Sequence, residues 1–154
     1  MPRRILVPIA GPSSLVAVDR ALQVAAAEGA RVTARGLEGC GPVGVAAVSA
    51  PDASVLRRRS TVAAAGREAR SRAAAIGGEF VFVSREGSPT EAIIDEARRC
   101  QADFIVVEEA MPWLPRWAHH GGARHLHHAT RSEVVVVGQQ GVASTPETST
   151  RPAA

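Results

Sequence analysis

Short apolar runs alternate with longer segments whose apolar residues recur at helical spacing. Five runs predict buried strands, at residues 4–9, 30–35, 80–83, 104–107 and 134–137. Between them the pattern predicts four helices: one that begins near Ser13 or Ser14 and ends at Gly29, one at 54–76, one at 88–100 and a short one at 122–129. Strands that alternate with helices favour a parallel sheet with helices on both faces. The pattern therefore predicts a single α/β domain with a five-stranded parallel sheet.

The ends of the predicted helices carry local signals. Ser13 or Ser14 is suited to cap the first helix, and Gly29 is suited to end it. The segment from Ser88 to Glu91 predicts a capping box, with proline at the first helical position. One face of the second helix is apolar and is expected to be buried; its residues are Val62, Ala65, Ala69, Ala73 and Ile76.

Composition and charge narrow the classes of function. The chain has 154 residues, of which 45% are hydrophobic and only 3% aromatic, so the core must consist mainly of Val, Ile, Leu and Ala. We expect one domain over residues 1–138 and a disordered tail over 139–154, because the tail is polar and lacks periodicity. All 18 basic residues are arginines, but the formal net charge is only +3, and a nucleic-acid partner is not expected.

The sequence carries no signal for export or for membrane insertion. Cys40 and Cys100 form neither a disulfide framework nor a metal-type spacing. The N-terminal apolar run is too short for a signal peptide, and no run approaches the length of a membrane span. We therefore expect a cytoplasmic protein without a membrane partner.

Three segments together resemble the universal stress protein family. They are RILVPI with the turn and helix that follow it, REGSPTEAI before ADFIVV, and GG, LHHAT and EVVVV near the end, in the family's order and at about its spacing. The resemblance extends over residues 4–137. It implies the Rossmann-like fold of the adenine-nucleotide alpha-hydrolases, with strand order 3-2-1-4-5, and usually a homodimer.

The nucleotide-binding motif of that family keeps its spacing here but not its chemistry. ATP-binding members carry an Asp at the end of the first strand, then Gly-x-x-Gly, nine residues and Gly-Ser or Gly-Thr after the fourth strand. The corresponding residues in this chain are Ala10, Glu108, Met111, Gly121 and Gly122, of which only Gly121 matches. Glycine lets backbone N–H groups approach phosphates, whereas Glu108 would place negative charge there. We predict no ATP binding of the family's kind and no cofactor. The alternative is an altered pocket for another adenine nucleotide at the ends of the first and fourth strands.

A second candidate site is a window that holds all five histidines: His119, His120, His125, His127 and His128. His125 and His128 lie one helical turn apart, as zinc ligands do, and His119 or His120 could add a third ligand. No cysteine or carboxylate completes a familiar pattern, so we do not predict a metal site. Trp113 and Trp117, which precede this window, leave two interpretations open, a contact with a protein partner or packing on their own domain.

The final strand predicts how the chain assembles. Val134, Val135, Val136 and Val137 form an edge strand in the inferred order, and neither charge nor proline interrupts them. We expect this strand to pair with a second copy across a two-fold axis. No nucleophile stands beside a base in the sequence, so we do not expect an enzyme. The predicted function is a dimeric interaction or regulatory module in a bacterial stress response, with a degenerate nucleotide site.

Overall fold

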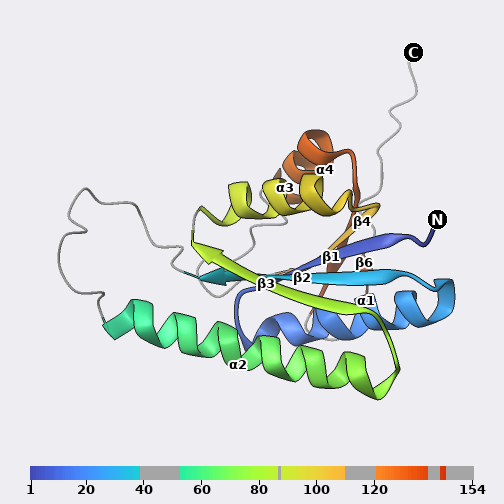
Figure 1. The fold of residues 1–154 in the computed structure, drawn as a ribbon. Coiled ribbons are helices and arrows are strands. Elements are labelled where there is room, and N and C mark those ends of the chain that lie inside the picture. Colours follow the sequence, from blue (N-terminus) through green and yellow to red (C-terminus); the bar gives the residue numbers. More distant parts are fainter. Residues whose placement is uncertain (39–52, 87, 110–120, 139–142, 145–154) are drawn as a thin grey trace, which may run out of the picture.

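The computed structural model describes residues 1–38, 53–86, 88–109, 121–138 and 143–144. The strands are β1 (Arg4–Ile9), β2 (Arg31–Glu38), β3 (Phe80–Glu86), β4 (Phe104–Glu108), β5 (Glu133–Val137) and β6 (Ala143–Ser144). The helices are η1 (Pro12–Ser14), a single 3-10 turn, followed by α1 (Leu15–Glu28), α2 (Ala53–Ala75), α3 (Pro89–Cys100) and α4 (Ala123–Thr130). Figure 1 shows one central sheet, with α1 and α2 on one face and α3 and α4 on the other.

The strand order is β3-β2-β1-β4-β5-β6. The first five strands pair in parallel, which confirms the predicted order 3-2-1-4-5. From β1 the chain turns to β2 on one side, and later it returns through β3 to β4 on the other side. In an open sheet of this kind, the carboxyl ends of the two diverging strands border a crevice where ligands usually bind. The carboxyl ends of β1 and β4 are therefore the first place to look for a site.

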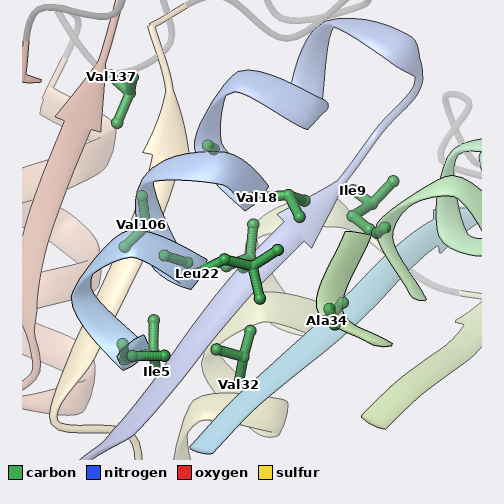
Figure 2. Close-up of a cluster of buried hydrophobic side chains, with 14 of the residues drawn as sticks. Ile5, Ile9, Val18, Leu22, Val32, Ala34, Val106 and Val137 are labelled. Carbon is green, nitrogen blue, oxygen red and sulfur yellow. The ribbon is translucent and has the colours of Figure 1, made fainter. Parts of the chain in front are cut away.

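Alternating side chains of the strands fill two separate cores. Figure 2 shows the core beneath α1, where Ile5 and Ile9 of β1 pack with Val18 and Leu22 of the helix. The core on the other face packs side chains of β1, β4 and β5 against α3 and α4; its largest members are Leu6, Ile93, Ile105, Leu126 and Val134. Both cores consist of aliphatic residues, as the composition predicted, and they hold β1 between two layers of helices.

Element ends account for most of the differences from the predictions. β2 continues to Glu38 and β3 to Glu86, so the predicted loop at 36–52 begins three residues too early; residues 39–52 lie outside the described part. β4 includes Glu108, one residue more than predicted. Four of the five residues on the expected face of α2 are buried, but Ile76 is 49% exposed because the helix ends at Ala75. Gly29 ends α1 in a left-handed conformation, as expected.

The predicted capping bonds do not form. Ser88 lies at the N-cap of α3 with Pro89 in the first turn, as the capping box requires, but its side chain makes no capping hydrogen bond. Ser14 lies at the N-cap of α1 and also makes no such bond. The Ser14 hydroxyl does not cap the helix because it is hydrogen-bonded to two other groups, which belong to the candidate site.

The tail contributes one strand that the sequence pattern did not predict. β6 pairs antiparallel with β5, Val136 opposite Ser144 and Val137 opposite Ala143. These two residues form a strand within the tail that we expected to be disordered; residues 139–142 and 145–154 lie outside the described part, so the expectation for the tail as a whole stays a prediction. The edge of β5 that was expected to be free is covered at Val136 and Val137. Backbone pairing accounts for this, because a strand this short needs no apolar pattern to add to an edge.

Candidate functional site

The site at the carboxyl ends of β1 and β4 is built by three residues, two from the turn after β1 and one from the end of β4. Ala10 follows the last residue of β1, Ser14 ends the short η1 helix, and Glu108 ends β4. All three are buried, with 3%, 0% and 2% of their surface exposed. A buried carboxyl group at the end of an apolar strand is costly unless other polar groups solvate it. Its surroundings therefore decide what the crevice can bind.

A chain of two hydrogen bonds crosses the crevice. The backbone N–H of Ala10 donates to the Ser14 hydroxyl at 2.9 Å. That hydroxyl in turn donates to Oε1 of Glu108 at 2.6 Å, in a buried environment. Ser14 thus ties β1 to β4 through its side chain. The Ala10 N–H, which a bound anion could otherwise have used, is already engaged.

The second carboxyl oxygen of Glu108 has no such partner. Within the described residues Oε2 is buried and makes no hydrogen bond of ordinary geometry, and the same holds for the Ser13 hydroxyl. Burial raises the pKa of the Glu108 carboxyl, and the neighbouring Ser13 and Ser14 hydroxyls oppose that shift only in part. A protonated Glu108 would have a proton to donate from Oε2, and Ser13 is the acceptor that remains. The Ser13 and Ser14 hydroxyls are therefore suited to solvate the Glu108 carboxyl in its neutral or its charged form.

The glycine pair that follows in the motif stands at the start of α4. Gly122 is the N-cap of that helix, and Gly121 before it has a φ of 90°, a left-handed conformation that favours glycine. In a parallel sheet the helix that follows β4 starts at the same edge where β4 ends, so Gly121 and Gly122 border the crevice. Met111 and the remainder of 110–120 lie outside the described residues.

The histidine window is only partly placed. His125, His127 and His128 lie on α4 and are exposed, whereas His119 and His120 lie outside the described residues. Nδ1 of His127 is 2.8 Å from the carbonyl oxygen of Ser132, so this ring is engaged with its own helix end. In the described part of the chain no group of three or more His, Cys, Asp or Glu side chains is arranged to hold a metal ion.

A second buried polar pair lies beneath α3, and the sequence did not point to it. Nη1 of Arg35 on β2 is 3.1 Å from Oε2 of Glu96 on α3, and both residues are 4% exposed. The Arg35 Nε is buried and, within the described residues, makes no hydrogen bond. Removing one member of such a pair leaves a buried charge, so the pair fixes α3 on the sheet.

The sequence pattern also did not predict the role of Ser14. We expected a helix cap there, and the structure instead joins Ser14 to a residue 94 positions away. One signal did exist. The run FIVV predicts a buried strand, and an acidic residue directly after it is unusual because charged side chains are rarely buried without a partner. That signal indicated a special environment for Glu108 but could not name its partner.

Comparison with known proteins gives a consistent result. The model of the Universal stress protein family matches residues 1–117. A universal stress protein solved in complex with cAMP is 25% identical, with 88% of this chain and 96% of that chain covered and a TM-score of 0.64. UspA from Lactobacillus plantarum is 22% identical, with coverage of 87% and 96% and a TM-score of 0.64.

A third structure is more distant. A universal stress protein family protein from Arabidopsis thaliana with AMP bound is 14% identical, with 89% of this chain and 92% of that chain covered and a TM-score of 0.58. At this identity, and at that of the Lactobacillus protein, the likeness shows the fold alone. No curated protein matches the chain.

Proposed function

The chain belongs to the universal stress protein family, and from this premise we propose that it is a non-enzymatic regulatory protein that does not bind ATP. In this proposal the protein's own Glu108 occupies the crevice in which the ATP-binding members of the family hold phosphates. The protein then acts through contacts with other macromolecules or with its own copies, in a stress response. A bacterial source and a cytoplasmic location stay predictions; in the described residues no helix is long and apolar enough to cross a membrane.

The observation that carries the proposal is the buried contact between Ser14 and Glu108. A carboxylate about 4 Å from a phosphate charge is repelled by about 4 kcal/mol at an effective dielectric constant of 20. Since 1.4 kcal/mol corresponds to a factor of ten in affinity, that repulsion costs roughly a thousandfold. A protonated Glu108 avoids the repulsion, but its side chain still stands at a position where the family's motif requires glycine. Both forms therefore oppose ATP.

The test is calorimetric titration with Mg-ATP. We expect no measurable heat of binding for the wild type at roughly 100 μM ligand, which corresponds to a free energy weaker than about −5 kcal/mol. The variant Ala10→Asp/Glu108→Gly/Met111→Gly/Gly122→Ser restores the whole motif, and we expect it to gain affinity. Glu28→Gly, the same chemical change at an exposed acid, serves as the control and should bind no better than wild type. A micromolar dissociation constant for the wild type would refute the proposal.

A second function has one observation in its favour. The relative solved with cAMP is 25% identical over 88% of this chain. A cyclic monophosphate carries a single negative charge, so Glu108 would repel it less than it repels a triphosphate. The protein would then be an adenine-nucleotide sensor with an altered pocket. Mass spectrometry of the protein as purified, under native conditions, decides between the two functions, because a sensor of this kind should retain nucleotide.

Homodimerisation through Val134, Val135, Val136 and Val137 is the assembly that we expected from the sequence, and it stays a prediction. The pairing of β6 with β5 limits it. A second copy could pair along the full length of β5 only if β6 left Val136 and Val137. The structure thus sets a condition on that dimer that the sequence did not reveal.

A further inference from the structure

The two edges of the sheet differ in how they are protected. β5 is covered at its carboxyl end by β6. β3 forms the opposite edge and pairs only with β2 in the part of the chain that the structure describes. An open edge exposes unpaired N–H and C=O groups, which natural proteins usually guard with charge, proline, a bulge or a cover. From Phe80 to Ser84 the strand carries no charged residue and no proline.

On one face, β3 also leaves an apolar side chain half exposed. Phe80 and Phe82 turn toward α2 and pack against the core beneath that helix. Val81 and Val83 turn to the other face, where α3 lies over β2 and β1. Val81 is 50% exposed as a result. A single exposed apolar side chain is common on protein surfaces, but Val81 lies beside the β3 edge, where an added strand would bury part of it.

The backbone of β3 shows which of its groups are free for pairing. The N–H of Val32 donates to the carbonyl oxygen of Glu79 at 3.0 Å, so Glu79 turns its backbone toward β2. In a parallel ladder successive residues turn their backbone groups alternately toward and away from the neighbouring strand. Phe80, Phe82 and Ser84 therefore turn their N–H and C=O groups outward.

We propose that the protein self-associates through β3, which pairs antiparallel with β3 of a second copy about a two-fold axis at Phe82. In this register Phe82 lies opposite Phe82 of the second copy, and Phe80 lies opposite Ser84. Each residue whose N–H and C=O groups turn outward is then opposite another such residue. These are the residue pairs that exchange two hydrogen bonds in an antiparallel ladder. The two sheets then continue into each other through the open edge.

The side chains fit the same register. Val81 of one copy stands opposite Val83 of the other, in the type of pair that brings side chains closest together. Glu79, which precedes β3, is paired with Arg31 of its own chain, so the valines and the outward-turned backbone groups set the register. A shift by one residue would oppose outward-turned residues to inward-turned ones. This self-complementarity favours a second copy over an unrelated peptide as the occupant.

Sedimentation of the full chain tests the proposal. We expect a dimer at roughly 50 μM, a concentration chosen because association follows mass action. Val81→Lys places like charges at the centre of the interface and should weaken dimerisation at least tenfold. Leu56→Lys is the matched control, since Leu56 on α2 is 51% exposed against 50% for Val81; it should dimerise as the wild type does. A wild-type monomer, or a dimer unaffected by Val81→Lys, overturns the proposal.

Crosslinking tests the register without a disruptive substitution. In a background with Cys40→Ala and Cys100→Ala, single variants Val81→Cys and Val83→Cys are prepared separately and mixed. The two cysteines face each other only between copies, within the separation that a disulfide spans. Mild oxidation of the mixture should give mostly the mixed crosslinked dimer, with much less crosslinking in either variant alone. Equal or absent crosslinking in all three samples refutes the proposed pairing.

Discussion

Glu108 is a buried acid at the end of β4, and its protonation should be measurable in the stability of the protein. Burial raises the pKa of this carboxyl above its ordinary value of 4.5. Protonation is then easier in the folded than in the unfolded protein, so the stabilisation from the proton is complete below the ordinary value. It is lost as the pH rises through the folded-state pKa of Glu108. We predict that Glu108→Gln, which is neutral at every pH, gains stability over wild type as the pH rises through that window.

Chemical denaturation of both proteins between pH 4 and pH 8 measures this difference. The control is Glu133→Gln, because Glu133 is exposed. The free-energy difference between this control and wild type should change little over the same range. A Glu108→Gln difference that stays constant, or that falls with rising pH, would mean that Glu108 is not held in an apolar environment.

Among the secondary-structure elements, α2 and β3 are joined by an unusually close contact. A Cβ added to Gly66 of α2 would lie 2.6 Å from Cζ of Phe82, closer than packed atoms approach. Alanine in the interior of a helix is normally favoured over glycine by about 1 kcal/mol. Overpacking costs about 1–3 kcal/mol. We therefore predict that Gly66→Ala destabilises the protein by about 1 kcal/mol, against the helix propensity.

The same substitution in a Phe82→Leu background separates the two effects. The shorter side chain removes the clash, so Gly66→Ala should then be neutral or stabilising, and thermal or denaturant unfolding of the four proteins gives the coupling energy. If Gly66→Ala stabilises the wild-type background as well, Phe82 can move aside at little cost. The packing of β3 against α2 would then be looser than the structure indicates.

At the scale of the whole molecule, the tail should limit the pairing of β5 with other copies of the chain. Removing residues 139–154 takes away β6 and uncovers the backbone of Val136 and Val137. We predict that the truncated chain associates more strongly than the full chain, because a run of four valines favours strand pairing. Sedimentation at several concentrations measures the change.

The Val81→Lys substitution makes this result specific to β5. In the truncated chain it blocks the β3 edge, so the association that remains must use another surface. Val136→Pro, which removes a backbone donor that turns outward from β5, should then abolish it. A truncated chain that behaves as the full chain would mean that β6 does not limit pairing at β5.

The resemblance to the family supplied the strand order of the first five strands, whereas the sequence pattern by itself determined the order and type of the elements and the parallel sheet. It did so because burial repeats with the period of the local backbone: apolar residues follow one another in a strand covered on both faces, and recur every three to four residues in a helix. The strand–loop–helix pattern that begins at residue 104 also indicated the crevice, and the resemblance to the family assigned Ala10, Glu108 and Gly121 to it. Element ends such as that of α2 at Ala75 were less well determined, because Ile76 fits the helical period but follows the last turn.

Only the tertiary structure decided the contacts between elements. Ser14 meets Glu108 over 94 positions, and Arg35 meets Glu96 over 61, so nothing local distinguishes these partners from other polar residues. The addition of β6 to β5 and the open edge of β3 depend on which backbone groups remain unpaired once the sheet is assembled. Backbone hydrogen bonding is available to nearly every residue type, and for that reason a sequence does not show which edge will be covered.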